Sequence, residues 1–237
     1  MRLRQRLGLE WLAVALLASA LVAGLAYWDN LLRFDNLVYD QLSAIDRPAP
    51  LPEIMIVEID EDSLAAFGKW PWSRHRHAEL FEQLAAGDPK AIGFDILLSE
   101  PGESDGDAAL AQAMAGNASL FLPLHFVFPG SNGAEYDVKQ PVAAFAGAAA
   151  GLGHVNLAFD PDGVVRRAAL CFGDKASGSD WPHLMESIYQ SVEGRPSSAY
   201  DRLGNCDQKL LMPFARRGAY QSVSYSALAS GQVPIAF

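Results

Sequence analysis

The chain has 237 residues, of which 50% are hydrophobic, and its 18 basic and 28 acidic side chains give a formal net charge of −10. An acidic surface argues against nucleic acid, and against an anionic membrane surface, as a binding partner. The chain is long enough for one sizeable hydrophobic core, and no internal repeat or long low-complexity tract divides its sequence.

The N-terminus combines a basic flank with an apolar segment. Residues 1–10 contain three arginines, and residues 11–28 contain no charged side chain and have a tryptophan at each end. Such a segment can cross a bilayer as a helix, with its basic flank in the cytoplasm. A cleaved signal peptide is the alternative, because the segment includes an Ala-Ser-Ala sequence. We favour the uncleaved anchor, since the apolar character continues well past that sequence, and either interpretation exports residues 29–237.

Residues 30–45 carry apolar side chains at helical spacing, among them Leu31, Phe34 and Val38. This spacing predicts an amphipathic helix. The helix either continues the membrane segment outward as a stalk or covers the core of the exported domain. Three prolines between residues 48 and 52 then end it.

Residues 54–59 form an apolar, β-branched run that predicts a buried strand. After this run come Trp70-Pro71-Trp72, two large rings around a proline, and Ser73, which is placed to cap a helix. The predicted helix carries His77 on the same inner face as its leucine and phenylalanine side chains. A second apolar run at 91–98 predicts a strand that pairs in parallel with the first through a right-handed crossover.

Two charged features of this region require partners. Asp95 lies inside the second apolar run, where a buried carboxylate has to be paired. Arg74, His75 and Arg76 add positive charge to the first turn of the helix, whose free N–H groups already make that end positive. We expect internal carboxylates to relieve this conflict, with a bound anionic ligand as the alternative. The expected carboxylates are those of Asp60, Asp62 and Asp95.

Polar and apolar side chains alternate over residues 154–159, which predicts a half-buried strand. The sequence Pro161-Asp162-Gly163 is typical of a three-residue hairpin loop with glycine in the left-handed position. The resulting register places Ala158 opposite Arg166. One face of the hairpin then carries a cationic and amide-bearing strip, with a solvated outer face as the plainer interpretation. The strip consists of His154, Asn156 and Arg166.

Composition and spacing predict the remaining elements of the exported part. They are a helix at 107–114, a strand at 119–127, a helix or loosely ordered segment at 142–150, an amphipathic helix at 181–192, a strand at 209–214 and a short helix at 225–229. Together the elements predict an α/β fold with a mostly parallel sheet, flanking helices and an antiparallel hairpin, preceded by one N-terminal transmembrane helix.

The sequence contains no recognisable catalytic or cofactor-binding motif. It lacks a Cys-x-x-Cys pair, histidines at zinc spacing, a Gly-x-Ser-x-Gly elbow and a glycine-rich phosphate loop. Aspartates at 60, 62, 95, 160 and 162 invite a metal-site interpretation, but the Asp-Pro-Asp-Gly sequence is better explained as the hairpin turn. We therefore expect no catalytic residue, no metal and no cofactor. Cys171 and Cys206 either form a disulfide, which export permits, or remain two thiols.

Several of these stretches together resemble one known family. The sequence VEIDEDSLAAFGKWPWSRHRHAELFEQL is similar to the pattern of the CHASE-type extracellular sensory domains of the second type, found in bacterial membrane receptors. The similarity continues in the family's order through AIGFDILLSEP, DAALAQAM, GLGHVNLAFDPDGVVRR and SVSYSALASGQVP, and it spans residues 29–237.

The resemblance implies a periplasmic sensor that controls a cytoplasmic kinase, as in two-component systems, or an adenylate or guanylate cyclase. It implies an input domain and not an enzyme, anchored in the inner membrane, which binds an unknown small-molecule or peptide ligand and forms a homodimer. The family continues with a closing strand and further membrane helices. Residues 29–237 are therefore expected to be a sensory domain that is C-terminally truncated relative to the family.

The candidate ligand-binding or switch residues lie in the family-like stretches, where they could equally hold the fold together. They are Asp60, Trp70, Trp72, Arg74, His77, Asp95, His154, Asn156 and Arg166. Two other functions stay open at this point: an exported metal-dependent hydrolase built on Asp60 and Asp95, and a structural domain for receptor dimerisation.

Overall fold

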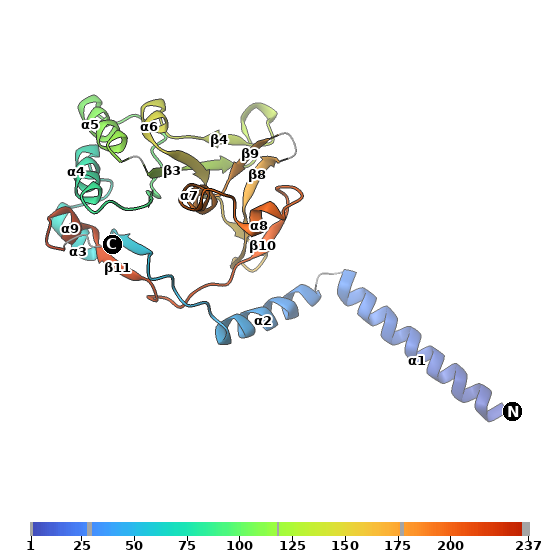
Figure 1. Ribbon diagram of the computed structural model, residues 1–237. Coiled ribbons are helices and arrows are strands. Elements are labelled where there is room, and N and C mark those ends of the chain that lie inside the picture. The colour runs from blue at the N-terminus through green and yellow to red at the C-terminus, as the bar shows by residue number, and fades with distance from the viewer. Residues whose placement is uncertain (1, 28–29, 118, 176–177, 234–237) are drawn as a thin grey trace. The chain divides into compact units, whose positions relative to one another are not determined.

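The computed structural model describes residues 2–27, 30–117, 119–175 and 178–233 (Figure 1). The chain divides into two compact units. The first comprises Met1–Ala49 with Pro213–Arg216, and the second comprises Pro50–Met212 with Arg217–Phe237. The second unit contains all the strands of the described chain.

The first unit contains two helices, α1 (Arg2–Tyr27) and α2 (Asn30–Ile45). Both helices were expected from the apolar pattern of the sequence. Within α1, the stretch Arg6–Gly24 is long and apolar enough to cross a membrane. The junction through which α1 would continue into α2 as a stalk lies at residues 28–29, outside the described residues.

The second unit is built around β3 (Leu120–Val127), an apolar and almost fully buried strand predicted at 119–127. β2 (Ile92–Gly93) and β5 (Gly151–His154) pair with β3 in parallel on its two opposite edges. β4 (Asp137–Lys139) pairs with the last part of β3 in the antiparallel direction. The strand predicted at 91–98 is thus reduced to two residues.

Pro123 lies in the middle of this central strand, where a missing N–H is normally costly. The carbonyl of Phe121 accepts from the N–H of Phe94, so alternate residues of β3 direct their backbone groups to the β2 edge. On that edge β2 ends opposite Phe121 and β4 begins opposite His125. Pro123 therefore faces the gap between these two strands, where the ladder needs no donor.

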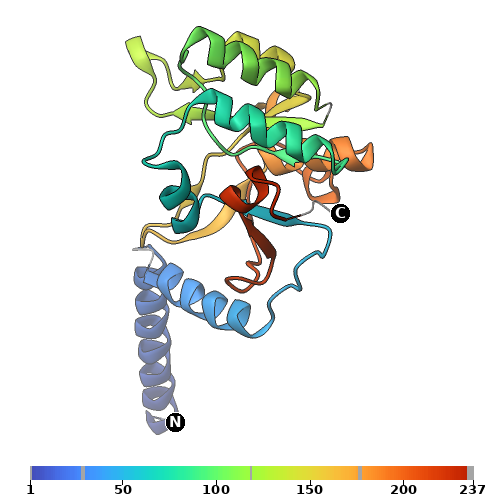
Figure 2. The same cartoon turned by 90° about the vertical axis from the view of Figure 1, so that its left-hand side faces the viewer.

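Helices cover one face of this sheet at α4 (Arg74–Ala85) and α5 (Ser104–Ala115), which lie side by side (Figures 1 and 2). Phe94 packs on this face, with its ring 4.9 Å from that of Phe81 in α4. The main hydrophobic core forms here from buried side chains that include Leu80, Leu98, Leu110, Met114, Leu120 and Phe145.

The opposite face of the sheet is covered by α7 (Leu184–Glu193). Consecutive residues of a strand point to opposite faces, and Gly93, next to Phe94, lies against the side chain of Ile188 in α7. A Cβ atom on Gly93 would lie 2.9 Å from Ile188 Cδ1. The helix therefore packs tightly against the glycine edge of β2.

β1 (Met55–Glu58) pairs in parallel with β11 (Gln221–Ser224), near the other end of the chain. The predicted parallel pair between residues 54–59 and 91–98 is therefore wrong, because β2 forms its ladder with the longer strand β3. The mixed α/β class is confirmed, with several small sheets. In the described chain, three strand pairs are parallel and four are antiparallel.

The predicted hairpin is formed by β6 (Ala158–Phe159) and β7 (Val165–Ala169), and β10 (Lys209–Leu211) pairs with the other edge of β7. A bulge places Arg167, and not Arg166, opposite Ala158. The predicted register is thus wrong by one residue beyond the bulge, whereas Phe159 still lies opposite Val165 next to the turn. The predicted polar strip does not form, because β5, which carries His154, belongs to another sheet.

A second hairpin is formed by β8 (Cys171–Asp174) and β9 (Ser179–Pro182). The helix predicted at 181–192 therefore begins later, at Leu184, because its first two residues belong to β9. A disulfide joins Cys171 to Cys206, whose Cα atoms are 5.0 Å apart. The bond connects β8 to the segment that leads into β10.

Short elements complete the described chain, and the helices expected near 107–114, 142–150 and 225–229 are all present. The elements are α3 (Glu61–Phe67), a 3-10 turn at Ser131–Gly133, α6 (Ala143–Ala148), α8 (Ser198–Asp201) and α9 (Tyr225–Ala229).

β5 approaches the start of α7 so closely that only glycine fits at position 153. A Cβ atom on Gly153 would lie 2.5 Å from the Cα atom of Leu184 and 2.6 Å from its backbone nitrogen. We expect Gly153→Ala to lower the free energy of unfolding by about 2 kcal/mol, because backbone would have to move. Denaturant unfolding of the full chain in detergent measures this change.

The matched control is Gly147→Ala in α6, where no atom lies within 4 Å of the added Cβ. This substitution is expected to be neutral or slightly stabilising, because alanine favours helix. Equal stabilities of the two variants would contradict the close approach of β5 to α7.

Candidate functional site

A cavity of about 340 Å³ opens beside the Trp70-Pro71-Trp72 turn. The start of α4 and the segment that follows β2 form its other walls. Four of the nine residues expected to bind a ligand line this cavity. The lining residues are Trp70, Pro71, Trp72, Arg74, His77, Ile96, Leu97, Ser99 and Glu100.

Aromatic rings form one wall of the cavity. The ring of Trp70 lies 5.3 Å from that of Trp72 and 5.6 Å from that of His77, both edge to face. The indole N–H of Trp72 donates to the carbonyl of Gly68 at 2.9 Å, at the end of α3. Trp72 is buried and Trp70 is half-buried. Trp72 thus packs into the hydrophobic core, and both tryptophan rings line the cavity.

His77 is 1% exposed and is held by Tyr225 of α9. The distance from His77 Nδ1 to the Tyr225 hydroxyl is 2.9 Å, and that hydroxyl donates its proton to the carbonyl of Arg76 at 3.1 Å. Because the tyrosine has one proton to give, it accepts from His77, so Nδ1 of His77 carries the N–H. The other ring nitrogen, Nε2, has no hydrogen-bond partner among the described residues.

Burial, and then the charge of Arg74, lower the pKa of His77 to about 4. Burial is also the main cause that raises the pKa of the Tyr225 hydroxyl. Both groups are therefore neutral near pH 7. The cavity contains a neutral imidazole whose free nitrogen is a hydrogen-bond acceptor.

The basic first turn of α4 is neutralised inside the protein, as expected, but by other carboxylates. Nε of Arg74 lies 3.5 Å from Asp107, and His75 lies 3.2 Å from Asp105. Both aspartates belong to the first turn of α5, where negative charge suits the helix N-terminus. Arg76 pairs with Glu79 within α4 at 2.9 Å. The predicted partners Asp60, Asp62 and Asp95 were wrong, because the side-by-side packing of α4 and α5 brings nearer acids.

Asp60 caps α3 and ties it to the end of the chain. Its Oδ1 accepts from the Ser63 N–H at 2.9 Å, from the Ser63 hydroxyl at 2.5 Å and from the Ser224 hydroxyl at 2.9 Å. The hydrogen bonds from Ser63, the largest cause, and from Ser224 lower the pKa of Asp60. Asp60 therefore joins α3 to the β11–α9 turn through its Oδ1 atom.

Asp95 is exposed, so the prediction of a buried carboxylate was wrong. The reason is that β2 ends at Gly93, and the segment after it leaves the sheet with alternate side chains facing solvent. Asp95 acts electrostatically on His183. Asp95 raises the pKa of His183, while burial, the larger effect, lowers it below its usual value.

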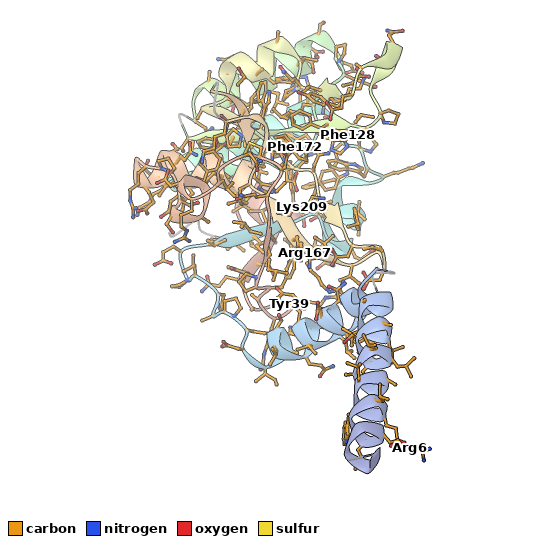
Figure 3. All side chains as sticks on the ribbon, turned by 90° about the vertical axis from the view of Figure 1, so that its right-hand side faces the viewer. Arg6, Tyr39, Phe128, Arg167, Phe172 and Lys209 are labelled. Carbon is orange, nitrogen blue, oxygen red and sulfur yellow. A yellow bond between two sulfur atoms is a disulfide. The ribbon has the colours of Figure 1, made fainter. Side chains whose placement is uncertain are left out.

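His154 is fully buried, at the end of β5. Its ring centroid lies 4.7 Å from that of Phe172 and 4.9 Å from that of His183. Phe172 lies beside Phe128 (Figure 3). Neither ring nitrogen of His154 has a hydrogen-bond partner among the described residues. Burial, and then the neighbouring His183, lower the pKa of His154 to about 3, so His154 is a neutral core residue.

Asn156 completes the edge of β3 where β5 has ended. Its side-chain oxygen accepts from the N–H of Phe126 at 2.8 Å, and its amide nitrogen donates to the carbonyl of Phe126 at 2.7 Å. The side-chain amide therefore replaces the peptide group of a neighbouring strand. Asn156 serves the sheet and leaves no free amide for a ligand.

Arg166 forms the centre of a compact ionic cluster in the hairpin. It is 4% exposed and lies 3.0 Å from Asp160 and 2.9 Å from Asp162, and Arg167 also contacts Asp160 at 2.6 Å. The hydrogen bond from Arg166 is the main cause that lowers the pKa of Asp162. Arg166 is thus neither solvated nor open to a ligand, because the aspartates of the hairpin loop neutralise it.

Sequence reasoning missed several residues of the site. Tyr225, Ile96, Leu97, Ser99 and Glu100 were not among the candidates, although all lie in family-like stretches. Tyr225 is 148 residues from its partner His77, and nothing in the sequence around Tyr225 indicates so distant a hydrogen-bond partner. The other four residues were assigned to a strand or a loop. Ile96 is half-buried and the other three are exposed, which could not be foreseen while the whole of 91–98 was expected to be a buried strand.

Two other places in the described chain have features of a binding site. A cavity of about 390 Å³ between α4 and α5 is lined mainly by alanine and acidic side chains, and by none of the expected residues. Among the described residues, one set of three side chains has the spacing of metal ligands: Cys171, Asp180 and Cys206. Both sulfur atoms of that set are used in the disulfide, so they are not available as thiolates.

The buried histidines predict that the protein loses stability in mild acid. The pKa values of His77 and His154 are lowered from 6.5, so below pH 6.5 the unfolded chain binds protons that the folded chain does not. Their contribution to stability is complete above pH 6.5 and decreases as the pH falls. Between pH 7 and pH 5 we expect a loss of about 2 kcal/mol for each of these histidines.

Denaturant unfolding of the full chain in detergent, repeated from pH 7 to pH 5, measures this loss. His154→Phe should lose about 2 kcal/mol less than the unmodified chain over this range. Phe172→Leu is the control, because it alters the same packing without removing a titrating group, and it should keep the original pH dependence. An unchanged pH dependence in His154→Phe would refute the neutral buried state of His154.

Comparison with known families agrees with these features of the chain. A family model described as the CHASE2 domain matches residues 14–236, which include the Trp-Pro-Trp turn, α4, the hairpin and α9. None of the curated proteins and none of the solved structures compared with the chain matches it. CHASE2 domains are extracellular sensory domains of receptors and not catalytic domains. The resemblance found in the sequence is thus confirmed, and the chain belongs to the CHASE2 family.

Proposed function

We propose that this chain is the signal-input part of a bacterial membrane receptor. In this proposal α1 anchors the chain in the inner membrane, residues 1–10 are cytoplasmic, residues 11–28 cross the bilayer and residues 29–237 lie in the periplasm. The observation that carries the proposal is the match of a sensory family to residues 14–236, together with an apolar helix at the start of that match. The three arginines before the apolar segment favour a cytoplasmic N-terminus.

We assign the input site to the cavity beside the Trp70-Pro71-Trp72 turn. Trp70, Trp72, Arg74 and His77 line it, whereas Asp60, Asn156 and Arg166 are used in hydrogen bonds or ion pairs that hold the fold. His154 is enclosed by aromatic rings, and Asp95 lies outside the cavity lining. The cavity is therefore the place where the expected residues combine surface access with an unused polar group.

We propose that a signal passes from this site toward the membrane anchor along the chain itself. His77 in the cavity bonds to Tyr225, the first residue of α9, and β11 directly precedes α9. Residues 213–216, which belong to the unit of α1 and α2, lie a few residues before β11. A ligand with different affinities for two positions of α4 relative to α9 would shift the balance between them.

The output that we propose is a cytoplasmic kinase or nucleotide cyclase, as the resemblance implies. The expected homodimer stays a prediction, which sedimentation of the full chain in detergent measures. The alternative of a metal-dependent hydrolase has little support. Asp60 is occupied as a helix cap, Asp95 is exposed, and CHASE2 domains are sensory.

The proposed topology predicts the behaviour of reporter fusions. Alkaline phosphatase, which is active only after export, is fused behind residue 233 and expressed in a Gram-negative host. We expect high phosphatase activity in the membrane fraction, because the apolar helix starts export and then anchors the chain. A green fluorescent protein fused at the same position and exported through the same pathway is expected to stay dark.

The matched control lacks residues 6–24 and should reverse both results, with low phosphatase activity and bright fluorescence. Activity of the intact fusion in the soluble periplasmic fraction would mean a cleaved signal peptide instead of an anchor. Low phosphatase activity of the intact fusion would place residues 29–237 in the cytoplasm and refute the proposal.

A further inference from the structure

We propose that the cavity beside the Trp-Pro-Trp turn binds a small uncharged molecule with an aromatic or other flat apolar body and one N–H or O–H donor. The donor would bind to Nε2 of His77. This inference rests on the proposed input site and specifies its ligand class.

The acceptor in the cavity is defined by its neighbours. The Tyr225 hydroxyl gives its one proton to the carbonyl of Arg76, so it must accept the proton on Nδ1 of His77. Nε2 is then left with a lone pair and no proton. His77 is 1% exposed and lines the cavity, yet no described residue donates to this nitrogen. Nε2 is not one of the fully buried polar atoms without a partner, so its lone pair keeps some contact with solvent, and an N–H or O–H of a ligand in the cavity would take the place of that contact.

The charges around the cavity argue against an anionic ligand. Arg74, the cation in the lining, is already paired with Asp107 at 3.5 Å and donates to the carbonyl of Glu100 at 3.3 Å. Its guanidinium also lies over the ring of Phe145, 5.9 Å from the centroid. An anion would have to compete with these contacts, and it would meet the lone pair of His77 and the backbone carbonyl of Glu100. An uncharged ligand meets no such cost.

The walls of the cavity favour a flat apolar body. Trp70, Trp72, Ile96 and Leu97 supply apolar surface, and the cavity of about 340 Å³ exceeds the volume of a single aromatic ring. The indole N–H of Trp72 is used on Gly68, whereas that of Trp70 donates to no described residue. Aromatic rings bind edge to face or offset against such indole faces. The aromatic lining would therefore select the shape of the ligand by stacking, and the hydrogen bond to Nε2 of His77 would fix the orientation of the ligand.

The test compares three probes of similar size: phenol, anisole and benzoate. Phenol has the O–H donor, anisole replaces it by a methyl ether, and benzoate is an anion without a donor. The full chain is labelled with ¹⁵N at its tryptophan indoles and placed in lipid nanodiscs, and each probe is titrated while the indole N–H signals are recorded. Trp70→Phe and Trp72→Phe assign the two signals from the cavity.

We expect phenol to shift the Trp70 signal in a saturable way, with an affinity at least about tenfold higher than that of anisole, because anisole leaves Nε2 unpaired. Benzoate should bind no more tightly than anisole. In His77→Phe the affinity for phenol should fall to that for anisole, while anisole binds as before. The matched control His125→Phe makes the same change in β3, away from the cavity, and should keep the preference for phenol.

A second variant tests the proton assignment without removing the imidazole. Tyr225→Phe deletes the hydroxyl that holds the proton on Nδ1, so the preference for phenol over anisole should decrease. Equal affinities for phenol and anisole in the unmodified chain, or tighter binding of benzoate, would overturn the ligand class and leave the cavity as the input site. No shift of the Trp70 and Trp72 signals with any of the probes would overturn the cavity assignment as well, whereas the receptor topology would still be judged by the reporter fusions.

Discussion

The hydrogen bond between His77 and Tyr225 is the contact on which the candidate site depends. It joins α4 to α9 across 148 residues of sequence, and Tyr225 passes its proton on to the carbonyl of Arg76. This chain of donors determines which nitrogen of His77 is protonated, and burial keeps the ring neutral. Near this bond, Asp60 accepts from Ser224 and joins α3 to the same turn before α9. The two contacts thus bring residues 60–77 together with residues 224–225 near the C-terminal end of the chain.

Charge pairing explains how an acidic protein can place three basic residues at one helix terminus. Arg74 and His75, in the first turn of α4, lie against Asp107 and Asp105 of α5. These carboxylates offset the positive charge at the start of α4, and they are themselves favourable in the first turn of α5. The same principle applies in the hairpin, where Arg166 is buried between Asp160 and Asp162. A buried arginine is tolerable only with such partners. The cations of the family-like stretches are therefore mostly structural, and the cavity is left close to neutral.

The family-like residues divide into two groups with different physical roles. Asp60, Asn156 and Arg166 satisfy backbone groups or opposite charges, and His154 is buried among aromatic rings between β5 and β8. Trp70, Trp72 and His77 combine packing with access to the cavity. A family pattern cannot separate these groups, because a residue that holds the fold and a residue that meets a ligand are equally specific in type. The separation requires knowing which polar atoms already have partners.

The sequence alone was sufficient to predict the apolar N-terminal helix, the central strand at 119–127, the start of α4 after Ser73, the hairpin turn and the family, although the Ser73 side chain forms no capping hydrogen bond. Each of these follows from periodicity or turn chemistry within a few residues, or from stretches of pattern read in order. Only the tertiary structure decided that β1 pairs with β11, that β2 ends at Gly93 and exposes Asp95, that a bulge shifts the register at Arg167, and that Tyr225 reaches His77. These features depend on contacts between residues far apart in the chain. Tertiary packing determines which strands pair and which carboxylates meet the cations, and the local sequence pattern does not contain that information.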